Sequence, residues 1–146
     1  MNSKPLNTIN YKEIIECGRT VLNIEEESIN EVKNRLDVSF AKAIELILDC
    51  RGTLIVSGLG KSGLIARKIS ATFSSLGTPS TFIHPGDALH GDLGLIKKND
   101  LIIMLSYSGE TEELIRLQFY LQEQGNLSIL ISGNKTSSLG ISCSLF

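Results

Sequence analysis

The feature that most limits how this chain can fold is an unbroken apolar run, Leu101–Leu105, which leads directly into a polar segment, Ser106–Thr111. A run of this length without alternation is typical of a strand buried on both faces of a parallel sheet. Beyond it, Leu114, Leu117 and Leu121 recur at helical spacing. The pattern therefore predicts a strand, a short hydroxyl-rich loop and an amphipathic helix, in that order.

Strands and helices alternate in the same way along the rest of the chain. Such alternation implies right-handed crossovers and a mostly parallel sheet. We predict an α/β fold, a three-layer sandwich with a parallel, flavodoxin-like sheet. Beside residues 101–105, the predicted strands are 53–57, 79–83 and 127–131, with 141–146 as a candidate fifth; the predicted helices are 64–75 and 111–124; residues 58–63 form a glycine loop, and 85–92 a short loop or helix.

The N-terminal third has a different pattern. Apolar residues recur at helical spacing from residue 11 to about residue 50, with glutamates on the other faces. We therefore expect a helical N-terminal segment over residues 1–50, ahead of an α/β domain over residues 51–146. Ser39 is a candidate cap of a second helix in this segment. Met1–Asn10 is polar and lacks the apolar core of a signal peptide.

Composition narrows the class of protein. Of 146 residues, 42% are hydrophobic and 21% charged, the balance of one compact globular domain. A net charge of −2 and an aromatic content of 5% offer no basic, base-stacking surface, so we expect no nucleic-acid partner. No apolar run approaches the length of a transmembrane helix, and the three scattered cysteines fit a reducing compartment. We expect a cytoplasmic protein with no membrane partner.

The segment after the apolar run is the first candidate site. The carboxyl edge of a parallel sheet is where ligands bind, and loop amides at a helix N-terminus attract anions. Ser106, Ser108 and Thr111 add hydroxyl donors beside Gly109, and such a cup suits a phosphate monoester. Thr111 is also a good helix N-cap, which would place Glu113 in the first turn, where the helix dipole favours acids.

A second candidate is the glycine loop of residues 58–63, which matches G-x-G-x-x-G between a strand and a helix. Dinucleotide binding would need an acid about 20 residues further on, but Asp87 arrives late, after a proline. A tight turn that only glycine can make explains the glycines but not Lys61 and Ser62. A cation and a hydroxyl at this position predict a second half of the same anion site.

Three further residues, His84, His90 and Tyr107, each allow more than one interpretation of their role. His84 and His90 are the only histidines, and with nearby aspartates they make a metal site conceivable, although their spacing is irregular. His90 could instead be a polar group at the edge of the same cleft, or be bonded to loop backbone. Tyr107, between two serines, could stack on a sugar or simply cover the loop.

Taken together, these segments resemble a known family. Ser106–Thr111 is similar to the phosphate loop of sugar isomerase (SIS) domains. With four further motifs it resembles D-arabinose-5-phosphate isomerases, which serve the synthesis of Kdo, a precursor of lipopolysaccharide. The resemblance runs from about residue 12 to residue 138. The four motifs are Gly58–Gly63, Gly77–Ser80, His84–Ala88 and His90–Gly94.

The resemblance implies an aldose–ketose isomerisation between ribulose 5-phosphate and arabinose 5-phosphate through an enediol, with a base, a cation and no cofactor. It implies a homo-oligomer, a dimer or tetramer with shared sites, and no required metal, although zinc could inhibit at His90. The implied roles are Lys61, Glu113 and His90 in catalysis; Ser62, Ser106, Ser108, Gly109 and Thr111 in phosphate binding; and Gly60, His84 and Tyr107 in lining the substrate.

One departure from the family bears on activity. In the family a further catalytic glutamate and histidine lie beyond the point where this chain ends, as do the usual CBS domains, and residues 142–146 depart from the family pattern. We therefore expect a C-terminally incomplete SIS domain. A sugar-phosphate-binding module without catalysis is the alternative, since it needs the hydroxyl loop but not Lys61, Glu113 or His90.

Overall fold

The computed structural model describes residues 10–146, so the polar stretch expected over the first nine residues lies outside it. The chain separates into two units, residues 1–37 and residues 38–146. Each unit is described by itself. Among the described residues, no helix is both long and apolar enough to cross a membrane.

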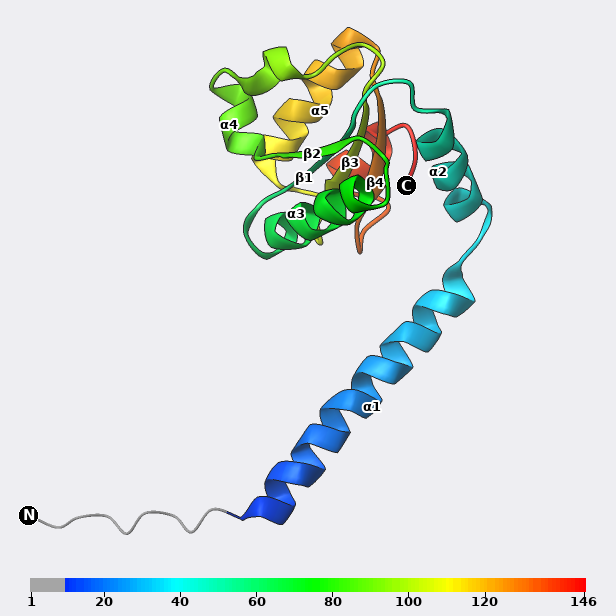
Figure 1. Cartoon of the computed structure of the whole chain (residues 1–146), viewed down its shortest axis with the longest axis vertical. Coiled ribbons are helices and arrows are strands. Elements are labelled where there is room, and N and C mark those ends of the chain that lie inside the picture. Colours follow the sequence, from blue (N-terminus) through cyan, green and yellow to red (C-terminus); the bar gives the residue numbers. More distant parts are fainter. Residues whose placement is uncertain (1–9) are drawn as a thin grey trace, which may run out of the picture. The chain divides into compact units, whose positions relative to one another are not determined.

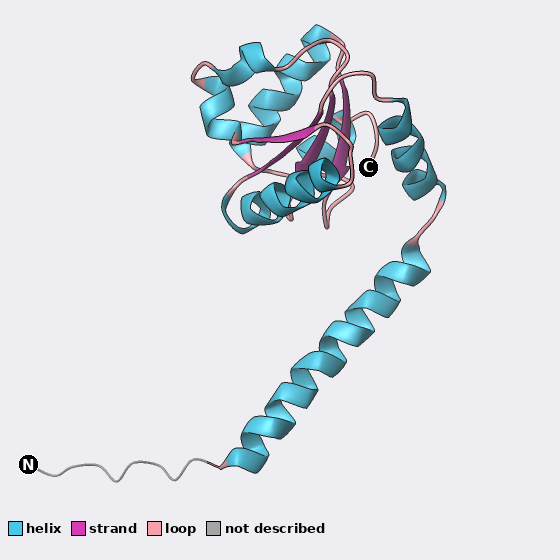
Figure 2. Ribbon diagram, viewed as in Figure 1, coloured by secondary structure: helices cyan, strands magenta, loops and turns pink. Residues whose placement is uncertain are grey.

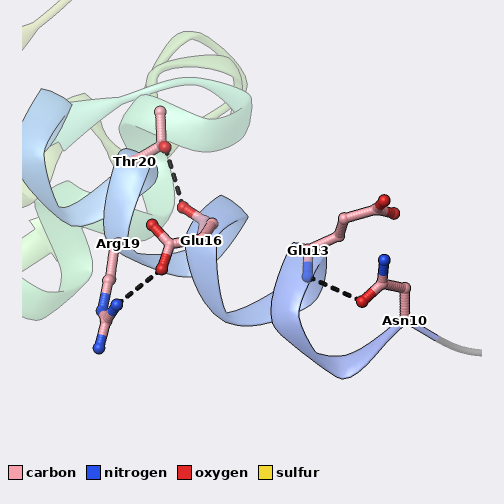
Figure 3. A network of polar contacts seen from close by, with 5 residues as sticks. All are labelled: Asn10, Glu13, Glu16, Arg19 and Thr20. Atoms are coloured by element: carbon pink, nitrogen blue, oxygen red, sulfur yellow. Dashed lines mark hydrogen bonds and ion pairs between the residues drawn. The ribbon is translucent and has the colours of Figure 1, made fainter.

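The described part of the first unit is a single helix, α1 (Tyr11–Arg35), with no buried residue. Asn10 caps it, since its side-chain oxygen accepts a hydrogen bond from the Glu13 amide at 3.4 Å. Arg19 pairs with Glu16 at 2.6 Å, and the Thr20 hydroxyl donates to the Glu16 carbonyl at 2.9 Å (Figure 3). Exposed pairs of this kind each contribute only about 0.3–0.5 kcal/mol.

The second unit is built on a parallel four-stranded sheet in the order β2-β1-β3-β4 (Figure 1). This order begins the flavodoxin pattern, so the predicted fold class is confirmed. Both central strands are buried along their whole length, and β3 accordingly consists of apolar residues only, while β1 ends in Ser57 and Gly58. The strands are β1 (Leu54–Gly58), β2 (Ser80–Ile83), β3 (Leu101–Leu105) and β4 (Leu127–Ile131).

Helices cover both faces of the sheet, which gives the three layers (Figure 2). On one face, α2 (Val38–Asp49) and α3 (Gly60–Ser75) pack on β1 and β3. The other face carries α4 (Pro85–Leu89), the 3-10 helix η1 (Asp92–Leu95), α5 (Glu112–Gln124) and α6 (Ser138–Ser142). The three leucines of α5 that the sequence singled out are fully buried there, each stabilising the fold by roughly 1.5–3 kcal/mol.

Three local expectations need correction. The second helix begins at Val38, so Ser39 lies inside it and is not its cap. The glycine loop is shorter than expected, because α3 already begins at Gly60. Residues 141–146 are not a strand: Ser137 caps α6, which takes up residues 138–142, and only a single bridge between Leu145 and Ile129 remains beside β4.

Candidate functional site

The sheet has its topological switch point between β1 and β3. From β1 the chain passes to β2 on one side of the sheet, whereas β3 lies on the other side and is followed by β4. Because all four strands are parallel, their carboxyl ends share one edge, and a crevice for ligands opens where the strand order reverses. The loops after β1 and β3 border that crevice. These loops contain the two candidate sites predicted from the sequence, residues 58–63 and 106–111.

A cavity of about 200 Å³ lies at this edge. Ser62 reaches it from the first turn of α3, while Ser106 and Tyr107 reach it from the loop after β3. The structure therefore brings together hydroxyls that are far apart in the sequence. The other lining residues are Leu105, Ile131, Ser132 and Gly133.

The loop after β3 is held by its own hydroxyls. The Ser106 and Thr111 side-chain oxygens lie 2.8 Å apart in a hydrogen bond, and the Gly109 amide donates to the Ser106 hydroxyl at 3.1 Å. The Glu110 amide donates to the Ser108 hydroxyl at 3.1 Å. Gly109 has a φ of 70°, the left-handed conformation that glycine adopts without steric cost. These bonds curl the segment into a closed cup.

Hydroxyl donors remain available in this cup. Whichever of Ser106 and Thr111 accepts the bond between them keeps its own O–H for another partner. Ser108 only accepts, so its O–H is also free to donate to a ligand. Both donors sit beside the N-terminus of α5, where the first amides lack acceptors in the helix. An anion such as a phosphate suits this set of donors.

The expected cap of α5 is wrong in one respect. Thr111 does occupy the N-cap position, but its side chain makes no capping bond to the helix. Its hydroxyl is instead paired with Ser106. The competing contact inside the loop leaves the amides at the start of α5 uncapped, and these amides are what an anion at this position needs.

The two other proposed ionic groups lie in the first turns of helices. Lys61 is exposed, immediately after Gly60 at the start of α3, and Glu113 is half-buried at the start of α5. In the part of the chain that the structure describes, neither side chain makes a hydrogen bond or an ion pair. Both are therefore available to a ligand, although neither lines the cavity.

The histidines lie at the two ends of α4. His84 is its N-cap and accepts a hydrogen bond from the Gly86 amide on Nδ1 at 3.2 Å. His90 is exposed at the other end of the helix. Neither lines the cavity, and among residues 10–146 no three His, Cys, Asp or Glu side chains cluster as metal ligands would.

Three residues at this edge were given no role from the sequence. Ser132 and Gly133 line the cavity because they follow β4 directly, and the rule that parallel strands end at one edge would have found them. Glu110 accepts a hydrogen bond on Oε1 from the Ser138 amide at 2.9 Å. Hydrogen bonding by Ser138, first through its side chain and then through its amide, holds the pKa of Glu110 below its usual value. No local sequence signal announces that contact.

The fold and the hydroxyl loop together define a sugar isomerase domain. Residues 46–145 match the SIS domain family, and the chain belongs to that family. The structure is also similar to solved relatives. One is an Escherichia coli CFT073 protein in complex with arabinose 5-phosphate, at 40% identity and a TM-score of 0.89, covering 94% of this chain and 73% of that one.

Several sequence relatives are named arabinose 5-phosphate isomerases, so the resemblance found in the sequence is confirmed. The chain is 44% identical over 131 residues to a probable arabinose 5-phosphate isomerase of Haemophilus influenzae, covering 90% of this chain and 38% of the relative. It is 44% identical over 127 residues to arabinose 5-phosphate isomerase KpsF of Escherichia coli, covering 86% of this chain and 39% of the relative. The chain thus spans less than half the length of these relatives.

Proposed function

We propose that the chain binds a pentose phosphate and belongs to an isomerase that interconverts D-ribulose 5-phosphate and D-arabinose 5-phosphate, as a step toward Kdo and lipopolysaccharide. The observation that carries the proposal is the hydroxyl cup of residues 106–111, whose Ser106 lines one cavity together with Ser62 at the switch point of the sheet. The names of the relatives and the ligand of the Escherichia coli structure support this choice of sugar.

In this proposal one set of residues binds the phosphate and another set carries out the isomerisation. The phosphate rests on Ser62, Ser106, Ser108 and Thr111 and on the amides at the start of α5, so the sugar carbons extend out of the cup. Isomerisation needs a base to remove the proton beside the carbonyl and a positive group to stabilise the developing oxyanion. Our candidate for the base is the Glu113 carboxylate, and our candidate for the positive group is the Lys61 ammonium. His90 is a further candidate for catalysis.

The alternative is a sugar-phosphate-binding domain that does not catalyse. One observation favours it: two of the proposed phosphate-binding residues, Ser62 and Ser106, line the cavity, whereas none of the proposed catalytic groups does. A binding domain needs only the assembled part. The two proposals agree on the phosphate site and differ only in turnover.

Loss of the hydroxyls tests the shared part. Replacing Ser106 and Ser108 together by alanine should weaken the binding of D-arabinose 5-phosphate about 100-fold in calorimetry, because each lost bond to a charged group costs roughly 1.5 kcal/mol or more. A matched pair, Ser28→Ala with Ser75→Ala, removes two exposed helix serines and should leave affinity unchanged. Unchanged affinity in the first pair would rule out the site. Formation of ribulose 5-phosphate from arabinose 5-phosphate by the wild-type chain would identify an isomerase, and binding without such formation would identify a binding domain.

The expected homo-oligomer remains part of the proposal. Its support is the uncovered apolar stripe of α1, where Ile15, Leu22 and Ile29 are 55%, 64% and 69% exposed. Amphipathic helices gain most of their stability by packing such a face. We expect an oligomer in sedimentation velocity, and a monomer when Leu22 and Ile29 are replaced by aspartate. Asn23→Asp, on another face of the helix, is the control, and a monomeric wild-type chain would contradict this part.

A further inference from the structure

The cup is braced by the segment that follows β4. We call residues 132–139 the bracing segment. It supplies donors to the backbone carbonyls of the cup: the Tyr107 carbonyl accepts from the Gly133 amide at 3.0 Å and from the Ser132 hydroxyl at 3.1 Å. The Gly109 carbonyl accepts from the Leu139 amide at 3.2 Å.

In each of these bonds the bracing segment donates and a carbonyl of the cup accepts. Carbonyl oxygens repel a phosphate, and two of those in the cup, on Tyr107 and Gly109, are engaged by the bracing segment. The free hydroxyl donors and the first amides of α5 are left for a ligand. Bracing therefore selects a loop conformation that already suits an anion, and a preformed site avoids the entropy cost of ordering a loop on binding.

Glu110 is the acidic residue of the cup itself. A carboxylate beside a phosphate site weakens anion binding by Coulomb repulsion. Its neighbours at the start of α5 differ from it, since Glu112 pairs with Arg116 one turn along the helix and Glu113 has no partner among residues 10–146. Glu110 alone of the three contacts a distant segment, the Ser138 amide 28 residues away in sequence. That amide follows Ser137, which is 1% exposed.

We propose that Glu110 is a positioning residue, which ties the phosphate cup to the bracing segment and so holds the anion-binding donors in place before the ligand arrives. This rests on the proposed function, since the ligand is a sugar phosphate. The carboxylate acts as a hydrogen-bond acceptor for the bracing segment, and its negative charge is a cost that the contact with Ser138 offsets.

The experiment compares three variants of the whole chain. Glu110→Ala and Glu112→Ala each remove one negative charge near the cup, but only the first removes a contact with the bracing segment. We expect Glu110→Ala to bind D-arabinose 5-phosphate about tenfold more weakly in calorimetry, despite losing a repulsive charge. Glu112→Ala should bind equally well or more tightly. Glu110→Gln keeps an acceptor oxygen and should bind within about threefold of wild type.

Amide hydrogen exchange gives a readout independent of ligand. The Ser138 and Leu139 amides should exchange several-fold faster in Glu110→Ala than in wild type, and Glu112→Ala should leave them unchanged. Equal affinities for Glu110→Ala and Glu112→Ala, or Glu110→Gln as weak as Glu110→Ala, would overturn the inference. If the wild-type chain binds no sugar phosphate, the proposed function fails, and unchanged exchange in Glu110→Ala would then overturn the positioning role on its own.

Discussion

Alanine at Gly109 is expected to abolish sugar-phosphate binding and to lower the free energy of unfolding by about 2–4 kcal/mol. Two costs combine at this position. The backbone φ of 70° lies in the left-handed region, which alanine adopts at a cost of roughly 1 kcal/mol. An added Cβ would also lie 1.9 Å from the Ser137 hydroxyl oxygen and 2.5 Å from its Cβ, closer than atoms can approach.

Ser137 cannot move aside to make room. Its side chain is buried, its hydroxyl donates to the Asn134 carbonyl at 2.7 Å, and it accepts from the Gly140 amide at 3.1 Å as the cap of α6. Either the cup or the bracing segment must therefore shift. A shifted cup separates the Gly109 amide from the Ser106 hydroxyl, which is why we expect binding to disappear along with the lost stability.

Gly125 provides a matched control for the backbone term. It also has a left-handed φ, 74°, but a Cβ there would meet nothing within 4 Å. Gly125→Ala should therefore cost only about 1 kcal/mol and leave affinity unchanged. Thermal unfolding and calorimetry of the two variants make the comparison. Equal destabilisation by both substitutions would show that the contact between Gly109 and Ser137 does not matter.

Local sequence signals were sufficient for the four strands of the sheet and for the position of the cup, although the candidate strand at residues 141–146 was wrong. The bounds of β3 and β4 agree with the predicted strands, because a run of apolar residues between polar segments is visible without knowing the fold. The parallel order follows from the alternation of elements and the handedness of crossovers. Those two facts place Ser62 and Ser106 at one edge, where the structure has them lining one cavity.

Contacts between distant segments were beyond reach of the same reasoning. Thr111 has the sequence of a cap, but a hydroxyl five residues earlier is a better-placed partner in the folded loop. Glu110 lies just before the N-cap of α5 and has no predicted role, yet it has a partner 28 residues further along the chain. Local propensity depends only on a residue and its near neighbours in sequence. In these two cases the hydrogen-bond partner is chosen by tertiary contacts, which propensity does not describe.

Alanine at Lys61 is expected to lower turnover about 1,000-fold if the proposed isomerisation is correct. Lys61 adjoins Ser62, a residue of the cavity, and among the described residues its ammonium has no ion-pair or hydrogen-bond partner to satisfy it. In the proposed complex the phosphate is bound next to this ammonium, so the sugar carbons attached to the phosphate lie close to it. The ammonium's attraction for the phosphate is the same in the substrate and in the transition state, whereas its attraction for the oxyanion arises only as the oxyanion develops, so kcat should fall as well as affinity.

Lys68→Ala is the control, because it removes the same charge from an exposed position of the same helix and should leave kcat unchanged. Lys61→Arg keeps the charge on a larger, planar group and should retain part of the activity. The measurement is the formation of ribulose 5-phosphate from arabinose 5-phosphate, in a form of the chain as long as its relatives. A kcat for Lys61→Ala close to that of wild type would remove this residue from the mechanism. The oxyanion would then need a positive group from outside α3, and His90 at the end of α4 would be the first residue to test.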